Sequence, residues 1–282
     1  MIEIETHAAA VEPLLTEAEV EQFERDGYLL IKGVLTRQEA ACCRDTILNM
    51  LPRDLSIPPE WTIYGGRIKP YLSGGSHTID LPGLMFLYGN ETLYRAAVQL
   101  LGCRELRVFD GSLAITLRND AGDSVLSQPL HLDAMVPAGI DFTFEPDELQ
   151  VGGAFYFTDV PAGGGGTHVV PGGHRRVEAL CRKHGKGSRA LFQNWKRIED
   201  FPETVEVTGE AGDFLIHHHL LPHAACHSRL PRPRVVRFQR YIRVQNRHSM
   251  VRTPAADRFN ADQRRGLSPL GAQLLGLQPW TE

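Results

Sequence analysis

The sequence is poor in lysine, in cysteine and in long apolar runs. Only five of its 30 basic residues are lysines, and its one arginine-rich stretch, residues 229–243, mixes the arginines with valine, phenylalanine and tyrosine. With a net charge of −4 and no basic cluster, the chain is a poor candidate for a nucleic-acid partner. The scarcity of lysine relative to arginine is typical of proteins from GC-rich bacterial genomes.

The five cysteines are odd in number, and no two of them form a Cys-x-x-Cys pair. A disulfide framework is therefore not expected. The first residues, Met-Ile-Glu-Ile-Glu, lack the cationic flank and apolar run of a signal peptide. No run of about 18 apolar residues is present that could cross a membrane. We expect a soluble protein of a reduced, bacterial cytoplasm with no membrane partner.

Helix signals dominate the N-terminal part of the sequence. Capping boxes at residues 16–19 and 36–39 precede apolar residues at helical spacing, and the helices should end at a glycine at 27 and a proline at 52. Residues 28–31 predict a short strand, and Asn90 predicts a third helix that ends at Gly102. The Pro- and Gly-rich segment 53–89 has no sustained period, and its aromatic residues, including Trp61, favour a loop that covers a site.

From residue 105 the pattern changes to short strands separated by turn residues, which is typical of a sandwich or barrel. We predict strands near residues 106–109, 113–118, 129–136, 153–158, 167–170, 204–207, 213–218, 221–226 and 234–244, and a short helix after His174. No repeat and no linker is visible. The prediction is one domain over residues 1–282, with a helical N-terminal part (1–104), a strand-rich core (105–245) and a C-terminal tail (246–282).

A His-x-Asp triplet lies in the predicted strand at residues 129–136. In an extended strand, residues two apart share a face about 7 Å apart, so His131 and Asp133 would point into one space. An imidazole and a carboxylate on one face are two members of the facial triad that suits iron(II). The same triplet can also be a plain hydrogen-bonded surface pair, and a metal site would need a third ligand from elsewhere.

Candidates for that third ligand gather in residues 212–223, which carry four histidines, and His227 follows. On a strand, His217 and His219 would share one face and His218 would lie on the other. The pattern alone does not choose among these three and His223.

Four motifs in this order resemble the phytanoyl-CoA dioxygenase family of iron(II)- and 2-oxoglutarate-dependent oxygenases. Residues 16–34, with Phe23 four residues before a Gly-Tyr pair, resemble the family's opening segment. His131-Leu132-Asp133 matches its first two iron ligands. Residues 167–175 resemble its Pro-Gly-Ser-His element, with Gly173 in place of the serine. Gly-Asp at 212–213, followed ten residues later by His223, resembles the segment that supplies the distal ligand.

The resemblance implies a mainly β protein with flanking helices around a double-stranded β-helix, a cupin-like jelly roll that would occupy residues 105–245. It also implies that His131, Asp133 and His223 bind Fe(II), and that 2-oxoglutarate and O₂ take the open positions, with release of succinate and CO₂. Related halogenases lack the carboxylate so that chloride can bind. The presence of Asp133 therefore indicates an oxygenase.

The distal carboxylate of 2-oxoglutarate needs a planar, permanently charged partner, which a guanidinium supplies through two parallel hydrogen bonds. Arg234, eleven residues after His223, stands where the family places this arginine. Arg232 is the rival, although the proline after it suggests a strand beginning. We predict weaker contributions to cosubstrate binding from three further residues, Thr167, Gln128 and Arg118.

For the substrate, the resemblance suggests a small molecule, such as a natural-product intermediate. The acidic and aromatic loop 138–148, which contains Asp141, could receive a cationic molecule or could simply be solvated. The insertion 184–202, which contains Trp195, could close over a pocket or lie on the surface. We take Trp61, Asp141, Trp195 and His219 as candidate substrate contacts.

Three readings compete. The first is a hydroxylase, or an enzyme that uses the same chemistry for desaturation, epimerisation or ring closure. The second is a non-catalytic jelly-roll binding protein, which would be expected to lack a triad residue or the cosubstrate arginine. The third is a zinc hydrolase with two histidines and a carboxylate, which would have no use for Arg234 and would need a general base that the sequence does not offer.

Overall fold

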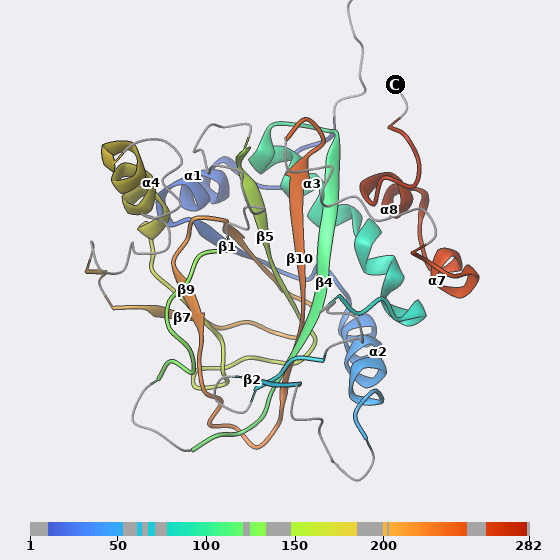
Figure 1. Ribbon diagram of the computed structural model, residues 1–282, viewed down its shortest axis with the longest axis horizontal. Helices are drawn as coiled ribbons and strands as arrows, with labels where there is room; N and C mark the ends of the chain where they lie inside the picture. The colour runs from blue at the N-terminus through green and yellow to red at the C-terminus, as the bar shows by residue number, and fades with distance from the viewer. Residues whose placement is uncertain are drawn as a thin grey trace, which may run out of the picture.

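Two antiparallel sheets form the frame of the protein (Figure 1). The computed structural model describes residues 11–52, 61–63, 67–70, 78–120, 125–133, 148–184, 200–201, 203–246 and 258–280. The large sheet has the strand order β1-β8-β5-β10-β4-β3-β2, and the small sheet has the order β7-β6-β9. The strands are β1 (Tyr28–Ile31), β2 (Thr62–Ile63), β3 (Arg67–Ile68), β4 (Leu106–Thr116), β5 (Gln150–Tyr156), β6 (Thr167–Val169), β7 (Val205–Val207), β8 (Phe214–His218), β9 (His223–Ala225) and β10 (Arg234–Arg243).

Most of the helices lie on one side of the large sheet, and the small sheet lies on the other (Figure 1). The helices are α1 (Glu17–Asp26), α2 (Arg37–Leu48), the 3₁₀ helix η3 (Pro82–Gly89), α3 (Glu91–Leu101), α4 (Gly173–His184), α7 (Ala261–Arg265) and α8 (Pro269–Leu274). Among the helices described, none is long and apolar enough to cross a membrane.

The central strand β10 shows how the two faces of the large sheet differ. Val235 and Tyr241 point toward the helices and belong to the main apolar core. Arg234, Phe238 and Arg240 alternate with them and line a cavity between the two sheets. Because strand residues alternate between faces, one strand supplies both the core and a row of polar groups facing the small sheet.

The predicted helix starts are confirmed. At α1 the Thr16 hydroxyl accepts a hydrogen bond from the Glu19 amide at 3.3 Å, and the Glu19 carboxylate accepts one from the Thr16 amide at 2.8 Å. Thr36 and Glu39 form the same capping box at α2. Gly27 ends α1 with a φ of 82°, and a Cβ there would lie 2.4 Å from Nδ1 of His174. Both the dihedral and the close approach require glycine at this position.

The structure corrects two of these sequence predictions about elements and places two helices in the predicted tail. The strands predicted at 106–109 and 113–118 are one strand, β4, in which the pairing with β10 shifts by one residue near Asp110. The segment 53–89 is not all loop, because its described residues include β2, β3 and η3. The tail 246–282 contains α7 and α8, which pack against η3. The apolar residues of these short elements are too few to show a period.

Candidate metal centre

Backbone pairing brings His131 and His223 together. Residues 125–133 run antiparallel to β9, although only isolated bridges, not the predicted regular strand, join them; residues 134–136 lie outside the described part. His131 and His223 exchange both backbone hydrogen bonds, at 2.9 and 3.0 Å. Such a pair stands directly opposite across two strands, so the side chains emerge side by side. Their ring centroids lie 4.3 Å apart.

Asp133 completes a set of three possible ligands. Donor atoms of His131, Asp133 and His223 all lie within 4.8 Å of one another. Nε2 of His223 is 3.4 Å from Oδ2 of Asp133. Nδ1 of His223 contacts the Leu221 carbonyl at 2.9 Å, so this nitrogen carries the proton and the lone pair of Nε2 faces Asp133.

The protonation states of these groups suit a metal ion. Burial lowers the pKa of His131 and of His223 to about 4. Burial opposes ionisation of Asp133, but the charge of Arg240 outweighs it and holds the pKa of this carboxyl well below its usual range. At neutral pH the site therefore offers two neutral imidazoles and one carboxylate, the forms that bind metals. This donor set fits iron(II).

A buried arginine holds the metal-site carboxylate. Nη1 of Arg240 lies 2.5 Å from Oδ2 of Asp133, and its Nε lies 3.0 Å from Oδ2 of Asp110. Asp110 has a φ of 80°, the only positive φ among the described non-glycine residues, and its Oδ1 accepts hydrogen bonds from the amide and hydroxyl of Ser112. The irregularity in β4 thus turns the Asp110 carboxylate toward Arg240.

The same cavity, of about 90 Å³, contains Arg234. Arg234 is 2% exposed, its Nη2 donates to the Thr167 hydroxyl at 3.3 Å, and its guanidinium lies 5.5 Å from the centre of the Tyr156 ring. Its Nε is buried without a hydrogen-bond partner. A buried, incompletely paired guanidinium beside a metal site fits an anionic cosubstrate such as 2-oxoglutarate.

Comparison with known proteins agrees with this geometry. The family model of phytanoyl-CoA dioxygenase (PhyH) matches residues 23–236. The chain belongs to this family. Membership confirms the predicted enzyme class, an iron(II)- and 2-oxoglutarate-dependent oxygenase. No curated protein matches the sequence at a significant level.

Solved structures with a similar fold include three enzymes. SnoN, an alpha ketoglutarate dependent epimerase from nogalamycin biosynthesis, is 21% identical with a TM-score of 0.55, over 81% of this chain and 82% of SnoN. The carbocyclase SnoK from the same biosynthesis is 18% identical with a TM-score of 0.51, over 88% and 95%. EctD from S. alaskensis with bound Fe is 18% identical with a TM-score of 0.55, over 84% and 79%. This likeness confirms the predicted jelly-roll fold.

The structure brings His223, not the triplet 217–219, into the set of three donors. His217 is a close neighbour: its Nε2 lies 3.5 Å from Oδ2 of Asp133, and its ring centroid lies 4.6 Å from that of His223. His219 is buried, its Nδ1 accepts a hydrogen bond from the Gln150 amide, and it does not line the cavity. Because β8 ends at His218, His219 does not continue the face of His217, and its contact with substrate stays a prediction.

The other predicted site residues divide into three groups. Thr167 and Gln128 line the cavity. Arg118 does not line the cavity: its side chain is exposed and donates to Asp120 at 2.7 Å, and its part in holding the cosubstrate stays a prediction. The reason is that β4 ends at Thr116, so the strand alternation no longer applies two residues later. Trp61 packs at the edge of the main apolar core and is not among the residues that line the cavity. The remaining two candidates, Asp141 and Trp195, lie outside the described residues.

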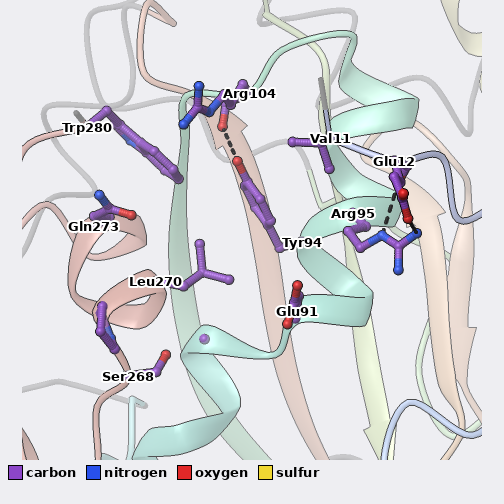
Figure 2. A pocket seen from close by; sticks show the side chains of 12 residues that line it. Val11, Glu12, Glu91, Tyr94, Arg95, Arg104, Ser268, Leu270, Gln273 and Trp280 are labelled. Atoms are coloured by element: carbon purple, nitrogen blue, oxygen red, sulfur yellow. Dashed lines mark hydrogen bonds and ion pairs between the residues drawn. The ribbon is translucent and has the colours of Figure 1, made fainter. Parts of the chain in front are cut away.

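A larger cavity, of about 680 Å³, lies away from the candidate metal centre, between α3, α8 and the N-terminal segment (Figure 2). The rings of Tyr94 and Trp280 stack there with their centroids 5.7 Å apart, and the Tyr94 hydroxyl donates to the Arg104 carbonyl. Of the groups of possible metal ligands in the described chain, neither has a member in this cavity. Size alone therefore does not identify the site.

A second group of possible ligands, His168, Glu206 and Cys226, lies on the small sheet. The Glu206 carboxylate accepts hydrogen bonds from the amides of Gly163 and Gly166 at 2.8 and 2.9 Å. Burial, followed by the charge of Glu206, raises the pKa of the Cys226 thiol to about 12. These contacts fasten the glycine turn at 162–166 to β7, which is a structural role.

Sequence reasoning missed four charged residues that line the cavity. Arg240 could have been found, because it lies six residues after Arg234 on the same predicted strand and an even spacing keeps both on one face. Asp110 falls between two predicted strands, and Arg67 and Lys69 fall in the predicted loop. No local pattern indicated that these three would reach the site.

Proposed function

We propose that His131, Asp133 and His223 bind iron(II), that Arg234 binds the distal carboxylate of 2-oxoglutarate, and that the enzyme hydroxylates a small molecule. The observation that carries this proposal is one small cavity that joins three metal donors to a buried guanidinium with an unused donor. When bound, iron(II) would couple the oxidative decarboxylation of 2-oxoglutarate by O₂, to succinate and CO₂, to oxidation of a substrate C–H bond.

The protein's own residues prepare this chemistry. The Leu221 carbonyl fixes the tautomer of His223, so that Nε2 is free to bind a metal. Thr167 accepts a hydrogen bond from Arg234 and holds the guanidinium in place for a carboxylate. Gln128 lies within 3.3 Å of Nδ1 of His131 and can orient that ring. Burial of His223, Thr167 and Arg234 keeps water away from them and strengthens each electrostatic contact.

The outcome of the oxidation depends on how the substrate is placed. An epimerase and a carbocyclase are among the enzymes of similar fold, so epimerisation and ring closure are alternatives to hydroxylation, as is desaturation. SnoN has been crystallised with nogalamycin RO and EctD with 5-hydroxyectoine, which supports a small-molecule substrate here. A cationic substrate, a role in natural-product biosynthesis and a cytoplasmic location stay predictions from the sequence.

The proposal is tested by titrating the metal-free protein anaerobically with iron(II) and then with 2-oxoglutarate, while recording visible absorption from the iron complex of the keto acid. Losing a charge-assisted hydrogen bond costs about 1.5–3 kcal/mol, so Arg234→Ala should weaken 2-oxoglutarate binding about 10- to 100-fold. Thr167→Val should weaken it less, and Asp133→Ala should abolish iron-dependent turnover. Arg232→Ala, which changes an exposed arginine two residues away, is the matched control and should bind normally.

Two results would contradict the proposal. A folded protein that gives no visible band and binds zinc instead would favour the hydrolase or the binding protein. Iron-dependent turnover that survives in Asp133→Ala would exclude this carboxylate as a metal ligand.

A further inference from the structure

The second group of possible metal ligands lies on the face of the small sheet that is turned away from the cavity. One donor atom from each of His168, Glu206 and Cys226 lies within 4.8 Å of the other two. His168 and Glu206 stand directly opposite each other in the pairing of β6 with β7, so their side chains share a face. Thr167 and Ala225 line the cavity, so the residues that follow them in the chain, His168 and Cys226, point the other way.

The histidine of this group has an unused ring nitrogen. His168 is 7% exposed. Its Nδ1 lies 2.8 Å from the Thr204 hydroxyl oxygen, whereas its Nε2 is buried and has no hydrogen-bond partner. When Nδ1 donates its proton to Thr204, Nε2 carries the lone pair that binds metals. Leaving a buried nitrogen unpaired costs free energy, which a bound metal ion would recover.

The sulfur and the carboxylate of the group already have nearly the spacing that zinc requires. Sγ of Cys226 lies 3.7 Å from Oε1 of Glu206. Zinc bonds of about 2.0–2.3 Å in a tetrahedron place two donors about 3.5 Å apart. Gly166 makes room for this approach, since a Cβ there would lie 2.8 Å from Cγ and 3.1 Å from Oε1 of Glu206. The chain itself therefore holds the carboxylate beside the sulfur.

The contacts that fasten the glycine turn leave ligand atoms free for an ion. Each oxygen of Glu206 accepts one amide hydrogen bond, from Gly163 or Gly166, and a carboxylate oxygen can accept two. The Cys226 thiol donates to the Gly166 carbonyl at 2.9 Å, a bond that ends when a metal displaces the thiol proton. A thiolate and a carboxylate side by side repel each other, and their two negative charges balance those of a divalent ion.

We propose that His168, Glu206 and Cys226 bind a zinc(II) ion that is separate from the iron(II) site. Thiolate and imidazole ligands in one tetrahedral site favour zinc over ions that prefer oxygen. Three protein ligands leave the fourth position to water, which reaches the group because the Glu206 side chain is partly exposed. The ion ties β6 and β7 to the end of β9. These strands carry Thr167 and His223 on their other face, so the ion stabilises the frame of the cavity.

The test is a titration of the full-length, metal-free protein with cobalt(II) under anaerobic, reducing conditions, while near-ultraviolet absorption is recorded. Cobalt(II) replaces zinc in tetrahedral sites, and a sulfur ligand gives it a charge-transfer band that nitrogen and oxygen ligands do not give. His131, Asp133 and His223 contain no sulfur, so cobalt at the candidate iron site does not contribute to this band. The band should saturate at one cobalt ion per chain and disappear when zinc is added.

Matched variants assign the band to the three residues. Cys226→Ser should abolish it, and His168→Gln and Glu206→Gln should each weaken cobalt binding at least about 10-fold. Cys181→Ser is the control: it changes another buried cysteine, outside the group, and should leave the band unchanged. X-ray absorption of the zinc-loaded wild type needs no variant and should show a sulfur neighbour about 2.3 Å from zinc.

Absence of the sulfur band or of the sulfur neighbour in the wild type would overturn the inference. So would a band that survives in Cys226→Ser, because another cysteine would then hold the ion, or a band that neither His168→Gln nor Glu206→Gln weakens. The visible band of the iron(II) and 2-oxoglutarate complex is a separate measurement. Its absence in the wild type would refute the proposed function and leave the zinc site unaffected.

Discussion

Replacing Arg240 by methionine tests how the metal-site carboxylate is held before metal arrives. The guanidinium is 12% exposed and lies between Asp110 and Asp133, with contacts of 3.0 and 2.5 Å. Methionine keeps much of the side-chain volume but removes the charge. Two buried carboxylates would then lose their shared cation, although Asp110 would keep its hydrogen bonds from Ser112.

The expected loss is large. Removing one partner of a buried ion pair costs about 3–5 kcal/mol, because the remaining charge stays out of water. We expect Arg240→Met to lower the free energy of unfolding of the metal-free protein by this amount at pH 7. Arg44→Met is the control: Arg44 pairs with Asp45 at the exposed surface, and such a pair contributes at most about 1 kcal/mol.

The loss should depend on pH with a definite sign. The pKa of Asp133 and that of Asp110 are both held below their usual values in the folded protein: burial opposes this, and the charge of Arg240 outweighs it. A carboxyl with a lowered folded pKa stabilises the protein above its unfolded pKa of about 4, and this contribution disappears as the pH falls through the folded value. The difference between wild type and Arg240→Met should therefore be complete at pH 7 and shrink below about pH 4.

Metal should also shrink the difference. Oδ2 of Asp133, which Arg240 contacts, is the oxygen that lies nearest to Nε2 of His223 and of His217. A divalent ion at the triad would supply the positive charge that the variant lacks. Urea unfolding of wild type and Arg240→Met under anaerobic conditions, with and without iron(II), measures the difference in their free energies of unfolding in each state. A difference in unfolding free energy below about 1 kcal/mol between the metal-free proteins at pH 7 would refute the reasoning, and so would a difference that neither metal nor acid reduces.

Three further predictions concern the frame. Gly153→Ala should cost at least about 3 kcal/mol, or prevent folding, because a Cβ would lie 1.8 Å from the Leu215 carbonyl oxygen; a normal urea midpoint would contradict this. Thr36→Ala should cost about 1 kcal/mol in the same assay through loss of the α2 cap, and no change would exclude the capping role. Iodoacetamide at pH 8 should label exposed Cys42 and spare Cys226, whose buried thiol has a pKa of about 12; equal labelling would show that Cys226 is accessible.

The elements that the sequence predicted well are those with local signals. Each capping box sets a helix start by bonds between residues three apart, and Gly27 sets a helix end by its own dihedral angle. Most of the jelly-roll strands were found to within a few residues because turn residues separate them, the exceptions being the predicted strand at 129–136 and the two predicted strands that form β4. Such signals depend on neighbours in the chain and need no knowledge of the rest of the fold.

The candidate site was predictable only in part, because its members meet through long-range pairing. The two-residue spacing of His131 and Asp133 suggested one face, but the partner His223 is chosen by the register of residues 125–133 against β9. No local pattern specifies that register, so the choice among four histidines required a family resemblance. Arg67 was missed for a related reason: a strand of two residues is too short to show alternation.

The irregularity in β4 explains how one cavity acquires both a carboxylate pair and an arginine pair. Arg234 and Arg240 share a face of β10 because Arg240 is the sixth residue after Arg234, and one inserted residue would place one of them on the other face. On the paired strand, Arg237 is opposite Leu113 and Gln239 is opposite Asp110. Between these two pairs β4 advances by three residues while β10 advances by two. The extra residue leaves the alternation of β10 intact and is absorbed at the positive φ of Asp110, whose carboxylate then reaches Arg240. The interruption between the two predicted strands therefore marks the site.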